Sequence, residues 1–216
     1  RTFTGSLPVH VSPVTLSPRF NPNSTGPEPS PGSGELPASV DKRQMSLLGA
    51  AWTVGSLKYL SESGAASVTY FETTGWKGVL ETEAGSGEPF PALPSGAFPL
   101  AHVFTWFGGM KSGEVLRTVS TDPLRVDGLA LRRDRWTRLL IANMSSKKQC
   151  VRVNLPGMTG SARVEALNAE TVERAVSEPR RFRSRKDLRN IETGGGSLDV
   201  DIGPYSVLCV KALIGE

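Results

Sequence analysis

Residues 41–78 constrain the fold more than any other part of the chain, because they join a long helical pattern directly to a short strand. Apolar residues recur at helical spacing over residues 45–60, and Gly64 follows as the expected C-terminal cap. The β-rich run Ser67–Phe71 comes next and ends on Glu72 and a polar loop. Helix, short buried strand and polar loop in this order indicate a βα unit of a parallel sheet or barrel.

The residues before this stretch predict another unit of the same kind. Residues 7–16 alternate apolar and polar side chains, which indicates a strand, and Pro13 suggests that the strand ends there. Residues 21–38 are rich in Pro, Gly and Ser and are typical of an active-site loop. Asp41 and Gln44 have the spacing of a capping box at the start of the helix.

A second helix is predicted over residues 98–110, and the pattern then changes. Short alternating runs separated by turn signals predict a β-sandwich. These runs cover residues 114–120, 125–133, 136–144, 149–155, 162–168, 197–203 and 205–213. The sequence therefore predicts two βα units in a first domain, residues 1–112, followed by a sandwich domain, residues 113–216.

Composition excludes several classes of protein. The 216 residues are 38% hydrophobic and 21% charged with a net charge of +4, as in ordinary globular proteins. The basic run Arg180–Lys186 has the charge of a nucleic-acid patch but no aromatic stacking platform, so a solvated loop is the favoured interpretation. No apolar run is long enough to span a bilayer. We expect neither nucleic acid nor membrane as a partner.

The two cysteines, Cys150 and Cys209, lie inside apolar strand patterns and predict buried free thiols. They favour a reducing, cytoplasmic compartment, and the glycosylation-like sites at Asn23 and Asn143 are too common by chance to overturn this. No motif for a metal site, a phosphate loop or a covalent nucleophile is present. We therefore predict no metal and no cofactor.

Several phrases of the sequence resemble one family throughout the chain. They are HVSPVTLSPRFNPNSTGPEP, QMSLLGAAWTVGSLKYL and SVTYFETTGWKGV in the first half, and DPLRVDGLALRR and LLIANM in the second. They look like the C-terminal part of bacterial D-apionate lactonases, and the block from SLKYL to SVTYFETTGW is the most specific. More generally, two βα units followed by a sandwich that closes with GPYSVLCVKA resemble the end of clan A glycoside hydrolases.

The resemblance implies a glycosidase-like (β/α)8 barrel and hydrolysis of D-apionolactone to D-apionate in pentose catabolism. It implies that the chain starts near the seventh barrel strand, so that residues 67–72 form the eighth. The start at Arg1, with little before the first strand, is typical of a piece of a longer protein. We expect an isolated piece to be inactive, since a partial barrel leaves sheet edges and apolar helix faces exposed.

One departure from clan A glycosidases bears on the chemistry. Retaining enzymes of that clan place a nucleophilic carboxylate at the end of the seventh strand, where this chain offers His10, Ser12 and Thr15. Attack on an ester needs a base and an oxyanion partner but no glycosyl-enzyme intermediate. A carbohydrate lactone hydrolase is therefore the leading hypothesis. The alternatives are a glycoside hydrolase whose carboxylates lie partly upstream, and a non-catalytic carbohydrate-binding module with Trp136 as its stacking platform.

Glu72 is the first candidate for catalysis, because it stands where a strand of the predicted barrel meets its loop. By strand alternation Glu72 shares a face with Tyr70, unless a bulge at the strand end redirects it. His10 is the second candidate, as a proton shuttle, with a structural histidine as the alternative.

Polar and aromatic residues near the predicted strand ends are candidates for substrate binding. They are Ser12, Arg19, Asn21, Thr73 and Trp76. Trp76 suits stacking on a sugar ring or anchoring its loop in equal measure. Glu81 and Glu83 are expected at the surface, and His102 is expected to pack inside its helix.

Overall fold

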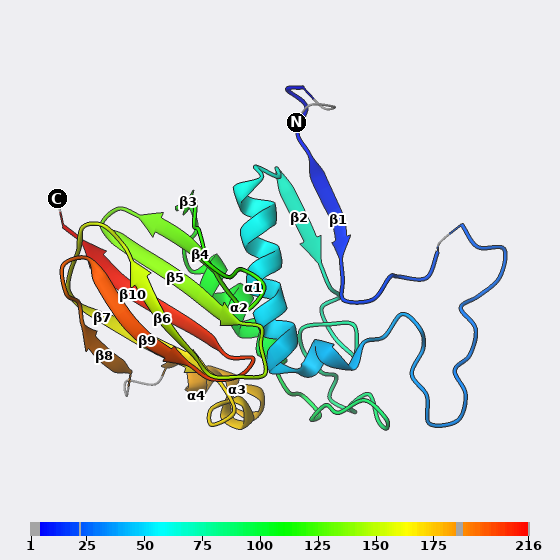
Figure 1. Cartoon of the computed structure of the whole chain (residues 1–216). Helices are drawn as coiled ribbons and strands as arrows, with labels where there is room; N and C mark the ends of the chain where they lie inside the picture. Colours follow the sequence, from blue (N-terminus) through cyan, green and yellow to red (C-terminus); the bar gives the residue numbers. More distant parts are fainter. Residues whose placement is uncertain (1–4, 22, 185–187, 216) are drawn as a thin grey trace.

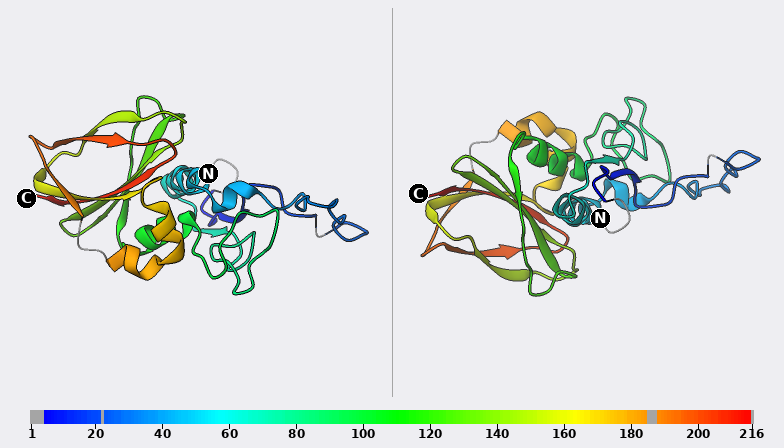
Figure 2. Two further views of the ribbon diagram at one scale, coloured as in Figure 1. Left: turned by 90° about the horizontal axis from the view of Figure 1, so that it is seen from below. Right: turned by 90° about the horizontal axis from the view of Figure 1, so that it is seen from above.

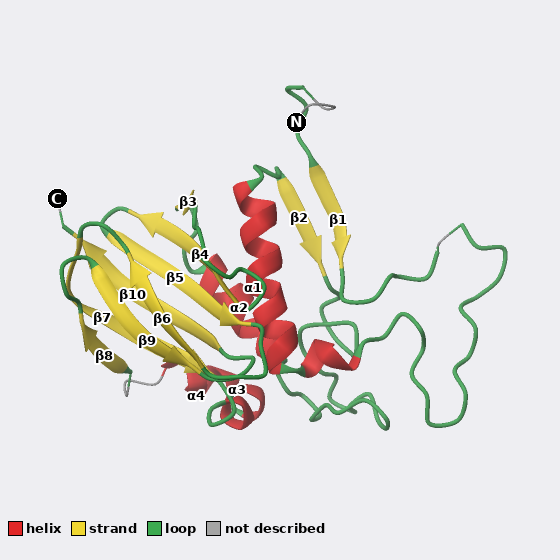
Figure 3. Cartoon of the chain, in the orientation of Figure 1, coloured by secondary structure: helices red, strands yellow, loops and turns green. Residues whose placement is uncertain are grey.

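The computed structural model describes residues 5–21, 23–184 and 188–215, which form a helix-rich region and a β-rich region (Figures 1 and 3). The first region contains β1 (His10–Val14), the 3-10 helix η1 (Lys42–Met45), α1 (Leu47–Glu62), β2 (Ser67–Tyr70) and α2 (Pro99–Gly108). The second contains β3 (Glu114–Leu116), β4 (Val126–Arg133), β5 (Trp136–Asn143), β6 (Gln149–Asn154), β7 (Met158–Leu167), α3 (Val172–Ser177), α4 (Pro179–Ser184), β8 (Arg189–Glu192), β9 (Ser197–Ile202) and β10 (Val207–Ile214).

Strands β1 and β2 are parallel neighbours, and α1 lies beside them as the crossover helix (Figure 1). The strand, helix and strand order predicted from the sequence is thus confirmed. The prediction that the first strand ends at Pro13 is wrong, because β1 continues to Val14. The pairing shifts in register between Val11 and Val14, and this irregularity accommodates a proline that cannot donate a ladder hydrogen bond.

The helical pattern of residues 41–64 forms two elements rather than one. Ser46 has extended backbone angles and its Oγ accepts a hydrogen bond from the Gly49 amide at 3.1 Å, so α1 starts after it. Asp41 caps η1 by accepting from the Arg43 amide at 2.9 Å. The expected capping box is absent, because the side chain of Gln44 donates to the carbonyl oxygen of Gly78 and not back to the start of the helix.

The β-rich region consists of a six-stranded antiparallel sheet in the order β3-β4-β5-β10-β7-β8 and the separate pair β6-β9. The large sheet lies between two coverings, helices on one face and the β6-β9 pair on the other (Figure 2). Strand β10 reads as a nearly continuous apolar run because both of its faces are covered. Val207 and Cys209 pack toward the helices, whereas Leu208 and Val210 pack toward β6 and β9.

Three elements of this region were not predicted. Strand β8 pairs antiparallel with β7, and α3 and α4 follow the end of β7. The favoured interpretation of the basic run as a loop is wrong for its described part, because residues 180–184 belong to α4. Phe182 supplies the apolar contact that fixes this helix. Its side chain is 1% exposed, and its ring packs edge-on to the His102 ring with 4.7 Å between the ring centroids. Arg185 and Lys186 lie outside the described residues.

Two further predictions concern single side chains. The side chain of His102 on α2 is buried as predicted, with Nε2 2.9 Å from the carbonyl oxygen of Ala175. Both cysteines are free, but only Cys209 is buried, and the expectation of a buried Cys150 is wrong. Cys150 lies on the outer face of β6, because this two-stranded layer has no further covering over the side chains that point away from the core.

The two regions are joined by buried polar contacts. The Lys58 ammonium on α1 bonds both carboxylate oxygens of Asp127 on β4, at 2.7 and 2.9 Å, and the Tyr59 hydroxyl donates to the same carboxylate at 2.8 Å. On α2, Trp106 Nε1 donates to Glu165 of β7 at 2.6 Å. A buried charge that lost its partner would be costly, so these contacts fix the helices on the sheet. None of the described helices has the length and apolar character to cross a membrane.

Candidate functional site

An open cleft of about 780 Å³ lies where β1 and β2 end. Its polar lining includes Ser12 of β1, Thr69 of β2, and Arg19 and Glu72, which follow the two strands. Arg19 Nη1 stands 3.8 Å from Glu72 Oε1, and the two side chains are 39% and 46% exposed. The carboxyl ends of two parallel strands thus place a cation and a carboxylate side by side at solvent, where both can reach a ligand.

The strict alternation of side chains ends just before Glu72, at the end of β2. Tyr70 and Phe71 are consecutive, yet both pack against the helices, Tyr70 through a 2.8 Å hydrogen bond to Ser56 and Phe71 through ring contacts with Trp52 and Phe104. Tyr70, Phe71 and Glu72 all line the cleft, so its lining does not distinguish a face shared with Tyr70 from a redirected strand end, and both interpretations of Glu72 stay predictions. In either case Glu72 turns toward the cleft and Arg19.

The loop after β2 is tightly ordered by its own backbone. The Glu72 amide donates to the carbonyl oxygen of Lys77 at 3.0 Å, and the amides of Val79 and Leu80 both donate to the carbonyl oxygen of Thr73. A Cβ at Gly78 would lie 2.7 Å from backbone atoms of Thr74, so only glycine fits there. This closure holds the backbone of Glu72 in place while its side chain stays accessible.

The structure brings Ser12 and Arg19 to Glu72 but not His10. His10 faces Ser67 at the opposite end of the strands, with Nδ1 2.7 Å from the Ser67 Oγ. Glu72 follows Ser67 by five residues, which corresponds to about 16 Å at the rise of a parallel strand. The two predicted catalytic residues therefore do not meet in one site.

The other predicted binding residues lie around the cleft without lining it. The Asn21 side chain is occupied by a local turn, accepting from the Asn23 amide at 3.0 Å. Thr73 is exposed in the loop beside Glu72. Trp76 is half-buried against the core and lines a narrow cavity with Arg19 and Gln44, which is the geometry of a loop anchor.

Three neighbouring side chains differ from what the sequence suggested. Thr69 lines the cleft, and strand alternation with Ser67 was the signal that could have identified it. Glu81 is 4% exposed and accepts hydrogen bonds from Thr82 and Ser86, so its predicted surface position is wrong. Gln44 is buried and binds the carbonyl oxygen of Gly78 at 2.7 Å, a contact between residues distant in sequence that no local pattern reveals.

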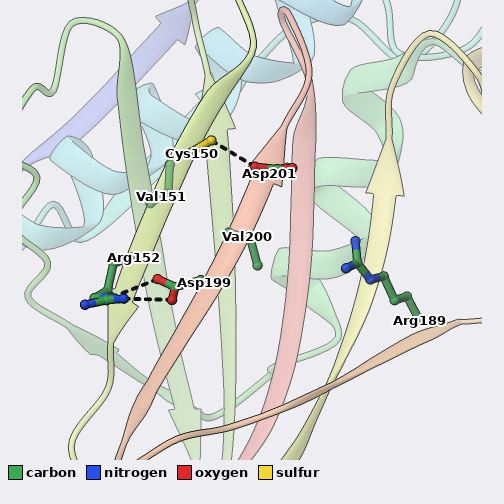
Figure 4. A pocket seen from close by; sticks show the side chains of 7 residues that line it. All are labelled: Cys150, Val151, Arg152, Arg189, Asp199, Val200 and Asp201. Atoms are coloured by element: carbon green, nitrogen blue, oxygen red, sulfur yellow. Dashed lines mark hydrogen bonds and ion pairs between the residues drawn. The ribbon is translucent and has the colours of Figure 1, made fainter.

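A second pocket, about 580 Å³, lies on the β6-β9 pair (Figure 4). Its two carboxylates are both paired with cations: Arg152 binds Asp199 through two 2.8 Å hydrogen bonds, and Lys148 lies 2.7 Å from Asp201. The Cys150 thiol also donates a hydrogen bond to Asp201 at 3.0 Å. The hydrogen bond to Asp201 and its charge raise the pKa of Cys150, which keeps the thiol protonated. This surface has the character of a cross-strand ion-pair ladder rather than a reactive centre.

Neither region offers a metal centre within the part of the chain that the structure describes. No group of three or more His, Cys, Asp or Glu side chains is placed there to hold an ion.

Trp136, the predicted stacking platform, is 52% exposed at the start of β5, opposite Leu213. The cleft with Arg19 and Glu72 is therefore the candidate site with the clearest chemistry.

The fold is similar to solved glycoside hydrolases. A family 30 endoxylanase from Clostridium papyrosolvens C71 aligns with a TM-score of 0.56 at 13% identity, over 80% of this chain and 39% of its own. A family 51 arabinofuranosidase from Xanthomonas axonopodis pv. citri aligns with a TM-score of 0.56 at 15% identity, over 84% of this chain and 38% of its own. This chain thus spans less than half the length of the structures it resembles, and at these identities the likeness concerns the fold.

Sequence comparisons identify the family. A search of curated proteins finds no significant match. The sequence model of the D-apionate lactonase TIM barrel domain matches residues 1–112, and that of the C-terminal immunoglobulin-like domain of the same family matches residues 123–210. Because the first match alone covers more than half of the 216 residues, the chain belongs to the D-apionate lactonase family and combines a TIM-barrel-like domain with an immunoglobulin-like domain.

Proposed function

We propose that this chain is the C-terminal part of a carbohydrate lactone hydrolase of the D-apionolactone to D-apionate type. Strands β1 and β2 are then the last two strands of its barrel, and the cleft at their ends is part of the active site. The family supports the substrate class. The observation that carries the proposal is the meeting of Arg19 and Glu72 in one cleft at the carboxyl ends of two parallel strands.

The proposed reaction uses Glu72 as the base and Arg19 as the oxyanion partner. The Glu72 carboxylate removes a proton from a water molecule as its oxygen bonds to the lactone carbonyl carbon. The Arg19 guanidinium stabilises the negative charge that develops on the carbonyl oxygen. When the tetrahedral intermediate collapses, the ring C–O bond breaks, and the proton held by Glu72 passes to the leaving alkoxide. The product is an open-chain hydroxy acid, whose new carboxyl group releases its proton to the solvent at neutral pH.

The other cleft residues have binding roles in this proposal. The hydroxyls of Ser12 and Thr69 line the side of the cleft formed by the strands and can hydrogen-bond sugar hydroxyls. Thr73 lies at the rim beside Glu72, and Trp76 supports the loop from behind. His10 takes no part in the proposed step, because it lies at the far end of the strands.

Glycoside hydrolysis is the competing function, since the similar solved structures are glycoside hydrolases. That reaction needs two carboxyl groups on opposite sides of the scissile bond. Among the described residues that line this cleft, Glu72 alone carries a carboxylate. The cleft by itself therefore fits ester attack better than glycosyl transfer.

Direct assays of the complete protein separate the two functions. D-Apionolactone and related aldonolactones are supplied at neutral pH and acid release is titrated, while aryl xylosides and arabinofuranosides are tested in parallel for phenol release. Acid release at least about tenfold above the spontaneous rate, without glycoside cleavage, supports the proposal. Cleavage of aryl glycosides without lactone hydrolysis would overturn it.

A further inference from the structure

The 3-10 helix η1 carries a buried side chain that reaches the loop of Glu72. Gln44 is 3% exposed and lies 34 residues from Gly78 in sequence, yet its Nε2 donates to the carbonyl oxygen of Gly78 at 2.7 Å. The same amide nitrogen lies 3.4 Å from the carbonyl oxygen of Lys77. That carbonyl also accepts the hydrogen bond from the Glu72 amide, so one peptide group connects Gln44 to the candidate base.

The start of η1 is tied to the other side of the cleft. The Ser17 hydroxyl donates to Asp41 at 3.2 Å, and Asp41 caps η1 through the Arg43 amide. Ser17 stands two residues before Arg19 on the segment that follows β1. Ser17, Asp41 and Gln44 line the same narrow cavity as Arg19, which confirms that these groups are spatial neighbours.

The η1 helix packs directly against the start of α1. A Cβ at Gly49 would lie 2.2 Å from the carbonyl oxygen of Arg43, so the first turn of α1 touches η1 without an intervening side chain. Ser46 lies between the two helices, and its hydroxyl donates a hydrogen bond to the backbone carbonyl oxygen of Arg43 at 2.8 Å. The turn that carries Asp41 and Gln44 is therefore held against the first turn of α1 by direct contacts.

We propose that Gln44 is a positioning residue, which sets the place of Glu72 opposite Arg19 through the 72–78 loop. The inference rests on the proposed function for its catalytic consequence, but its structural part stands independently. Catalytic geometry is sensitive to shifts of about 1 Å, so loosening this loop should reduce turnover more than substrate binding. A hydrogen-bond donor is required at this position, because Gln44 meets two carbonyl oxygens, which accept and cannot donate.

Amide hydrogen exchange of the complete protein tests the structural part, with Gln44→Leu as the main variant. Exchange over residues 72–79 should be at least about tenfold faster than in the wild type, whereas residues 207–214 should keep their protection. Gln149→Leu is the matched control, because Gln149 also donates a side-chain hydrogen bond, 3.0 Å to Ser145 in the other domain. Unchanged exchange over residues 72–79 in Gln44→Leu, or equal acceleration in Gln149→Leu, would overturn the inference.

Gln44→Glu separates a positioning role from simple filling of space. When ionised, its carboxylate faces two carbonyl oxygens and cannot donate, so the loop should exchange as in Gln44→Leu. Burial raises the pKa of a carboxyl at this position above its usual range, and once the pH lies below that pKa the neutral acid regains a donor and protection relative to the wild type at the same pH should return. A side chain that only filled space would show no such rescue, and its absence would contradict the proposal.

Kinetics of the same variants test the catalytic part. In Gln44→Leu, kcat for lactone hydrolysis should fall at least about tenfold while KM changes less than about threefold. If the wild-type protein does not hydrolyse lactones, the proposed function fails, and the exchange data still decide whether Gln44 positions the loop. If lactone hydrolysis is found and Gln44→Leu retains full kcat, the positioning role is wrong.

Discussion

Two of the three sheets in the described residues differ in how their faces are covered. The six-stranded sheet is buried on both faces along β10, whereas β1 and β2 pack on helices with one face and expose the other. The same contrast appears in two ion pairs. Lys58 and Asp127 meet at 2.7 Å with side chains 4% and 1% exposed, while Arg19 and Glu72 stand 3.8 Å apart with side chains 39% and 46% exposed. Burial makes the first pair structural, and exposure leaves the second pair available for a ligand.

Thiol labelling gives the largest expected difference between the two sheets. Cys209 lies in β10 and is fully buried, and burial raises its pKa to about 12, so it should react only when the sheet opens. A Thr69→Cys substitution places a thiol on the open face of β2. In a Cys150→Ser background, we expect Cys209 to react about 10³-fold or more slowly than the thiol at position 69, as measured by maleimide labelling and mass spectrometry. Similar rates would mean that the two sheets are equally accessible.

The buried ion pair gives the next largest effect. Lys58→Met leaves the Asp127 carboxylate without its cation and should lower the free energy of unfolding by about 3–5 kcal/mol, measured by urea denaturation. The pKa of Lys58 is raised, because the hydrogen bond and charge of Asp127 outweigh the opposing effect of burial. Arg152→Met removes a well-formed but exposed pair and should cause no measurable loss. Equal losses in the two variants would remove the distinction between buried and exposed pairs.

The exposed ion pair should affect rate and not stability. Glu72→Gln removes the proposed base and should lower turnover of a lactone by about 10²-fold or more, while the unfolding midpoint stays within error. Glu83→Gln is the matched control, since Glu83 is an exposed carboxylate of the first domain that does not line the cleft. Full activity of Glu72→Gln would rule out its role as base, and a large loss of stability would contradict its exposure.

The smallest effect concerns α1, which contacts β2 through Ser56 and the six-stranded sheet through Lys58. Ser46→Ala removes the side-chain cap of this helix and should cost about 1 kcal/mol of unfolding free energy. Ser63→Ala at the other end removes a solvent-exposed hydrogen bond to the carbonyl oxygen of Leu60 and should lower the unfolding free energy by less. Circular dichroism during thermal unfolding measures both. If Ser46→Ala unfolds at the wild-type temperature, the break between η1 and α1 does not depend on this cap.

Local sequence patterns predicted the elements whose signals lie within a few residues. The run Ser67–Phe71 gave a parallel strand, and residues 98–110 gave a helix with a buried histidine. The basic run misled because its charges suggest solvent, while a single buried Phe182 decides that it is helical. Strand alternation likewise failed at Phe71, where ring contacts with Trp52 and Phe104 override the two-residue period.

The sequence by itself determined the family and Glu72 as the first candidate, and it predicted the order of the elements apart from η1, α3, α4 and β8. These features depend on local spacing and on motifs that remain contiguous in the chain. The tertiary structure decided which residues share a site. It placed Arg19 and Ser12 beside Glu72, put His10 at the far end of the strands, and set Gln44 beneath the loop. The physical reason is that packing of parallel strands and their crossover helix fixes distances between residues far apart in sequence, and no local pattern encodes these distances.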